Sequence, residues 1–156
     1  MKIKNNTARF LLFSLFFFLA AFMPSSFAFA QSASEMDAML HADTVSAARA
    51  VRFVLGAADL LQSGISAAEA ERVAYDMAAS NGWIKAKSDE SITMRETAFL
   101  IMKAFNMKGG IMYSIFKNPR YAYREMVYRN LIPGRMNGNI KVTGSALLAI
   151  LDRVTQ

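Results

Sequence analysis

Three short segments of the chain carry the signals of a helix start, and each is followed by apolar residues at helical spacing. A serine or threonine that can cap a first turn stands at Ser66, Thr93 and Thr143. At Ser66 and Thr93 a glutamate follows three positions later, which is the capping-box pattern. Apart from residues 139–142, no stretch alternates apolar and polar residues over more than three or four positions. We therefore predict an all-α fold, a small helical bundle of about five or six helices.

The ends of the predicted helices follow from further caps and breakers. The first helix of the bundle has Asp43 or Thr44 as its cap and ends at Gly64. Asn118-Pro119 is typical of a cap followed by a first helical residue, and it predicts a helix that runs to about Asn130. The other predicted helices begin at Ser66, Thr93 and Thr143, and a short apolar segment occupies 111–116.

The first thirty residues have the three parts of a secretory signal peptide. Three basic residues stand within the first nine positions, residues 10–23 are apolar except for one serine, and Ala28-Phe29-Ala30 supplies small residues before Gln31. The apolar run is shorter than the roughly 20 residues that a membrane span needs. We therefore expect residues 1–30 to be cleaved as a signal peptide, the alternative being a retained anchor. The mature protein is then exported to the periplasm or cell surface, with no membrane span.

The remaining chain is predicted to consist of a flexible lead-in over 31–42 and one helical domain over 43–156. Without residues 1–30 it has 15 basic and 12 acidic side chains, so its formal charge falls from +6 to +3. That charge is too small for a strong polycation, and we expect no nucleic-acid partner. The chain has no cysteine and one histidine, His41, which leaves little for metal or nucleophilic chemistry. We expect no cofactor, no metal and no enzymatic activity.

Two stretches of the domain match at a spacing of 48 residues. Each contains an Ala-Tyr pair within a helix and, after the helix stop, a large apolar residue followed by isoleucine. The matching pairs are Ala74-Tyr75 with Ala122-Tyr123, and Trp83-Ile84 with Leu131-Ile132. Each copy continues through a polar loop to a capping threonine. The match predicts two related helix–loop–helix units, over 66–107 and 119–155, beside an N-terminal helix.

The segment from Ile92 to Ala98, Ile-Thr-Met-Arg-Glu-Thr-Ala, resembles the Ile-Thr-Arg-x-Glu stretch of S-layer homology modules. Arg95 stands one position later than in that family, and the second unit has neither the arginine nor the glutamate after Thr143. The resemblance implies a bundle of helical repeats on an exported protein, attached without covalent bonds to a cell-wall polysaccharide. It transfers a ligand-binding role to Arg95 and Glu96. The structural alternatives are a capping role for Glu96 and a solvated surface position for Arg95.

The predicted helix over 119–130 carries the remaining candidate ligand-binding residues. Tyr121, Arg124 and Tyr128 stand at i, i+3 and i+7, so they share one side of the helix. Two tyrosines beside an arginine can stack on a sugar ring and bind its hydroxyls. Arg120 belongs to the surrounding basic residues, which suit an acidic polymer or lipid head groups. The alternative is that the tyrosines pack under a neighbouring helix and the arginines are solvated.

These patterns together predict a non-enzymatic envelope module. Its expected partner is a cell-wall or acidic surface polysaccharide, or an envelope protein on which it docks. A periplasmic protein-binding adaptor or chaperone-like factor is the alternative. Polysaccharide binding requires that Tyr121, Arg124 and Tyr128 be exposed together, whereas an adaptor requires a contiguous apolar patch of several hundred Å², as an order of magnitude. A small hydrolase is disfavoured because no well-placed carboxylate pair is found.

Overall fold

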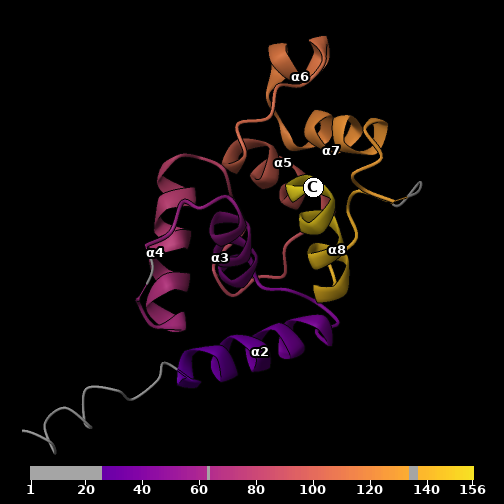
Figure 1. Cartoon of the computed structure of the whole chain (residues 1–156). Helices are drawn as coiled ribbons and strands as arrows, with labels where there is room; N and C mark the ends of the chain where they lie inside the picture. Colours follow the sequence, from indigo (N-terminus) through magenta and orange to yellow (C-terminus); the bar gives the residue numbers. More distant parts are fainter. Residues whose placement is uncertain (1–25, 63, 134–136) are drawn as a thin grey trace, which may run out of the picture. The chain divides into compact units, whose positions relative to one another are not determined.

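The computed structural model describes residues 26–62, 64–133 and 137–156 (Figure 1). These residues form seven helices: α2 (Ser26–Leu40), α3 (Ala47–Ala57), α4 (Ala67–Ser80), α5 (Met94–Ala104), α6 (Ile111–Phe116), α7 (Pro119–Tyr128) and α8 (Gly144–Thr155). Within the described ranges the only extended pairings are two isolated bridges, Ser46 with Ser91 and Thr93 with Lys141. The predicted all-α fold is confirmed.

The chain divides into two units, one up to Met36 and the other from Asp37 to Gln156. Most of the predicted signal peptide, residues 1–25, lies outside the described residues. The expected cleavage point after Ala30 falls within α2. The segment 31–42, expected as a flexible lead-in, is helical as far as Leu40, and the side chain of Met39 is fully buried.

The helix starts were predicted correctly where a cap is followed at once by helical residues. Thr93 forms the complete capping box: its hydroxyl accepts from the Glu96 amide, and the Glu96 carboxylate accepts from the Thr93 amide at 3.0 Å. Asn118 caps α7 through the Tyr121 amide, with Pro119 as the first helical residue. Thr143 caps α8 through the Ala146 amide.

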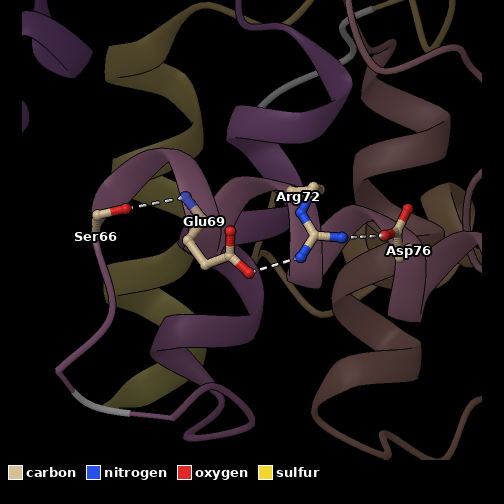
Figure 2. A network of polar contacts seen from close by, with 4 residues as sticks. All are labelled: Ser66, Glu69, Arg72 and Asp76. Atoms are coloured by element: carbon tan, nitrogen blue, oxygen red, sulfur yellow. Dashed lines mark hydrogen bonds and ion pairs between the residues drawn. The ribbon is translucent and has the colours of Figure 1, made fainter.

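One predicted helix start differs from the structure, and one predicted capping box is only half formed. The cap of α3 is Ser46, not Asp43 or Thr44, because the backbone of Val45 just before it is hydrogen-bonded to two other loops, at Val142 and Ile92. The capping box at Ser66 is only half formed: Ser66 accepts from the Glu69 amide, but the Glu69 carboxylate turns to the Arg72 guanidinium, 2.6 Å away. Figure 2 shows Arg72 held between Glu69 and Asp76 on the surface of α4. The hydrogen bond to Glu69 raises the pKa of Arg72 above its ordinary value, so its charge is kept and locally balanced.

The helix α5 lies in the core, as its apolar sequence predicted. Ala98, Leu100 and Ile101 are fully buried, and α5 packs against α7 and α3. Thr97 is also fully buried, and its hydroxyl donates to the Thr93 carbonyl at 3.0 Å. That bond provides the partner a buried hydroxyl needs. In turn α3 packs against α4 and α8.

A ring of three backbone hydrogen bonds joins the segments that precede α3, α5 and α8. Val45 donates to Val142, Val142 donates to Ile92, and Ile92 donates to Val45, at 3.0, 3.0 and 2.9 Å. All three side chains are buried. Beside each bond, the first residue of a helix donates to the neighbouring loop: Ala47 to Glu90, Met94 to Ile140, and Gly144 to Ala42. The three helices therefore start from one shared, buried junction. The relation of 66–107 to 119–155 as sequence repeats stays a prediction.

Candidate functional site

The helix α7 presents a polar stripe to solvent. Ala122 and Met126 are fully buried and fix which side of α7 faces the core. Arg120, Arg124 and Tyr128 stand four residues apart on the opposite side and are exposed. Tyr128 is 84% exposed. The exposed stripe therefore consists of two arginines and a tyrosine at i, i+4 and i+8.

Tyr121 does not share that full exposure. Its side chain is half-buried, and its ring stacks on Phe116 with centroids 5.3 Å apart and planes 23° from parallel. The predicted stripe of two tyrosines beside an arginine is therefore half correct. Tyr128 offers an open ring, whereas one face of Tyr121 is covered by the end of α6.

Glu125, between the stripe and α6, is occupied by structural contacts. Its carboxylate accepts from the Gly110 amide at 2.9 Å and from Arg129 Nε at 2.8 Å. Burial acts to raise the pKa of Glu125, but the hydrogen bonds from Gly110 and Arg129 outweigh it, and the pKa lies below its ordinary value. Arg129 also donates to the Lys108 carbonyl. Glu125 therefore remains ionised at neutral pH and holds the 105–110 loop against α7.

A cavity of about 430 Å³ lies beside α6 and is lined by three lysines, Lys103, Lys108 and Lys117. Neutral polar groups of Asn106, Ser114 and Tyr113 complete the polar lining, and no acidic residue is part of it. The Lys103 ammonium lies over the Phe99 ring, 5.3 Å from its centroid. Burial raises the pKa of Tyr113, which therefore stays protonated. The volume is in the range of ordinary ligand sites, and the charge of the lining suits an anion.

The stripe and the cavity lie in the most one-sided stretch of charge in the domain. Residues 103–133 contain six basic side chains and one acid, Glu125, which is paired with Arg129. Among the described residues, Lys108, Lys117, Arg120 and Arg124 take part in no ion pair. The arginine of α4, Arg72, has two acids beside it. The α5–α7 region therefore carries positive charge that the fold does not neutralise.

Arg95 and Glu96 are not joined to this region. Glu96 is occupied by the capping box, as its structural alternative predicted. Arg95 is half-buried, its amide donates to the Gly138 carbonyl at 3.0 Å, and a Cβ added at Gly138 would lie 2.6 Å from Arg95 Cγ. In the described part of the chain, no hydrogen bond or ion pair links Arg95 or Glu96 to the α7 stripe.

Sequence reasoning missed the cavity and the exposure of α6. The three lysines stand 5 and 9 residues apart, across Gly109 and Gly110, so no helical period relates them. The apolar segment 111–116 has the composition of a buried element, yet four of its five apolar side chains are exposed. Gly109 was the available signal, because a Cβ added there would overlap the side chain of Tyr113, so the turn before α6 requires glycine.

The described residues contain no candidate metal site and no candidate membrane span. Within 26–62, 64–133 and 137–156, no group of three or more His, Asp or Glu side chains is arranged to hold a metal ion. No helix in those ranges has both the length and the apolar character to cross a bilayer. No family model, curated protein or solved structure matches the chain.

Proposed function

We propose that the chain is an exported, non-enzymatic envelope module that binds an acidic surface polysaccharide through the region from α5 to α7. The observation that carries this proposal is that the segment 103–133 contains both the exposed stripe of Arg120, Arg124 and Tyr128 and a cavity lined by three lysines and no acid. Neither charge set is neutralised by the fold. An anionic polymer with repeated acidic groups could engage both at once.

The α7 stripe and the lysine-lined cavity can bind different groups of the same polymer. Arginine can bind a carboxylate or phosphate through two parallel hydrogen bonds. The open ring of Tyr128 can stack on a sugar face, and its hydroxyl can bind a sugar hydroxyl. The lysines of the cavity act as point charges for an acidic substituent of the polymer. The predicted export and the resemblance of residues 92–98 to S-layer homology modules support a cell-wall polymer as the source.

The experiment is co-sedimentation of the protein with purified cell-wall sacculi, with and without their attached polysaccharide. We expect pelleting only when the polysaccharide is present, and a loss of about tenfold in binding for Arg124→Ala combined with Tyr128→Ala. Arg72→Ala is the matched control, because Arg72 is an exposed arginine that two acids already neutralise.

The outcomes separate the possible sites. Binding that survives the α7 double substitution but is lost in Arg95→Ala would move the site to the segment that resembles S-layer homology modules. Equal binding to both kinds of sacculi, or none, would exclude the polysaccharide as ligand.

The alternative function, a periplasmic adaptor or chaperone-like factor, depends on an exposed apolar patch. The outer face of α6 supplies one. The lysines and arginines around α6, however, favour an anionic surface over an apolar protein partner.

A further inference from the structure

The short helix α6 presents an apolar face that the described chain contacts only at Phe116, whose ring stacks on Tyr121. Ile111, Met112, Ile115 and Phe116 are all exposed, Ile111 by 80% and Ile115 by 66%. At 100° per residue these four positions span a single arc of α6, and Tyr113 and Ser114 lie on the opposite side, where they line the cavity. Scattered exposed apolar residues need no explanation, but four on one face of a single helix do.

The helix is held so that this face points away from the bundle. Tyr113 is buried and packs with the core. The Gly110 amide that begins α6 is bound by Glu125, and the ring of Phe116 at its end stacks on Tyr121. Figure 1 shows α6 beside α7, beyond the other helices of the domain. A fixed apolar face costs less ordering on binding than a mobile one.

Basic residues lie at both ends of the apolar face. Lys108 precedes α6, Lys117 is its C-cap, and Arg120 follows in the first turn of α7. All three are exposed and are not part of any ion pair in the described chain. The nearest acid along the chain, Glu125, is occupied by Arg129 and Gly110.

This charge pattern decides what covers the face. A second copy of the chain would place lysine opposite lysine across a symmetric contact, which is unfavourable. An anionic lipid surface suits both the apolar face and the basic residues at its ends. Its head groups neutralise the basic residues, while the apolar face enters the acyl boundary.

We propose that α6 inserts its outer face into the interface of an anionic lipid membrane, with Lys108 and Lys117 binding the lipid head groups. Six residues cannot cross a bilayer, so the contact is shallow and reversible. It shares Lys108 and Lys117 with the lysine-lined cavity, whereas the apolar face of α6 serves only the lipid contact and Arg124 and Tyr128 serve only the polysaccharide site.

The first test places a reporter on the face itself. The chain has one tryptophan, Trp83, so Trp83→Phe with Ile115→Trp gives a single fluorophore on α6. The full chain is mixed with phosphatidylcholine vesicles that contain or lack about a quarter phosphatidylglycerol. We expect a blue shift and quenching by brominated acyl chains only in the anionic vesicles. No quenching in either vesicle would overturn the proposal.

The second test compares matched variants by vesicle flotation. Ile111→Asp with Ile115→Asp should reduce binding to anionic vesicles by at least about tenfold. Lys108→Gln with Lys117→Gln should reduce it by about fivefold or more for each charge removed. Leu60→Asp is the control, because Leu60 is an exposed apolar residue outside α6. All variants carry the same residues 1–30, so a difference between them reports α6.

The remaining outcomes are equally decisive. Vesicle binding that is unchanged by the α6 aspartates would overturn the proposal. A concentration-dependent dimer in ultracentrifugation that Ile115→Asp abolishes, without anionic-vesicle binding, would assign the face to a second copy instead. Sacculus binding by the Ile111→Asp, Ile115→Asp variant and vesicle binding by the Arg124→Ala, Tyr128→Ala variant distinguish the two proposals, because neither variant changes the lysines that line the cavity.

Discussion

The carboxylate of Glu125 accepts a hydrogen bond from the amide of Gly110, 2.9 Å away, and so joins α7 to the residue at which α6 begins. The same carboxylate binds Arg129, whose guanidinium also reaches the Lys108 carbonyl. This one ionised group therefore helps to fix the position of α6, together with the buried Tyr113 and the stacking of Phe116 on Tyr121.

Replacing Glu125 with glutamine should cost about 1 kcal/mol of stability at pH 7, because the charge that binds Arg129 is lost. The pKa of Glu125 is lower in the folded protein than its ordinary value of 4.5. A carboxyl group with a lowered folded pKa stabilises the fold above its unfolded pKa, and this contribution is lost as the pH falls through the folded pKa. The difference between the two proteins should therefore shrink as the pH falls below 4.5 and through the lowered folded pKa of Glu125.

Urea unfolding of the parent and Glu125→Gln at pH 7, 5 and 3 checks this. Asp76→Asn is the control, because Asp76 forms only an exposed ion pair with Arg72 and should show no measurable change at any of these pH values. A Glu125→Gln difference that grows as the pH falls would contradict the assignment.

Gly144 should be intolerant of any side chain. A Cβ at this position would overlap the carbonyl oxygen of Met39, which is backbone and cannot turn aside. We expect Gly144→Ala to destabilise the fold by about 3 kcal/mol. Gly56→Ala is the matched control in α3: its added Cβ meets no atom within 4 Å, so it should stabilise by about 0.5 to 1 kcal/mol. Thermal unfolding that shifts equally in both variants would show that the close approach is absent.

The cap at Thr93 should matter more than the cap at Ser66. Thr93→Ala removes the hydroxyl that accepts from the Glu96 amide and donates to its carboxylate, and we expect a loss of about 1 to 2 kcal/mol. Ser66→Ala removes a single exposed hydrogen bond of 3.3 Å and should cost about 0.5 kcal/mol. Denaturant unfolding measures both. Thr93→Ser retains the hydroxyl and should lie close to the parent, and an equal loss in Thr93→Ser would attribute the effect to packing of the methyl group.

The exposed residues of α7 should be replaceable without harm to the fold. Arg124→Ala and Tyr128→Ala remove side chains that make no ion pair or ring contact within the described residues, so the free energy of unfolding should stay within about 0.5 kcal/mol of the parent. Circular dichroism and urea unfolding check this. A larger loss would mean that reduced polysaccharide binding by these variants reflects folding.

The helices could be predicted because their signals are local. The caps at Thr93, Asn118 and Thr143 each satisfy an amide within the next three residues, and no distant contact overrides them. The prediction at Asp43 or Thr44 was wrong because the amide of Val45 is bound by the carbonyl of Val142, nearly a hundred residues later in the chain. Such a bond leaves no mark in the sequence around it.

The candidate site could be predicted only in part, for a related reason. Helical spacing placed Arg124 and Tyr128 on one side of α7, and both are exposed. It could not show that Phe116 covers a face of Tyr121, or that Glu125 is occupied by Gly110, because both contacts come from α6 and the loop before it. The lysine-lined cavity depends on the same loop and was not predicted.

The ring formed by Val45, Ile92 and Val142 has a kinetic consequence. Each of the three residues both donates and accepts, so the release of any one segment breaks two of the three bonds. The three amides should therefore exchange with deuterated solvent only when the whole domain opens. Closing the ring also brings together segments from near the two ends of the domain and its middle. The rate at which this helical protein folds should therefore be limited by chain closure over long distances, as in β-proteins, and not by the formation of its helices.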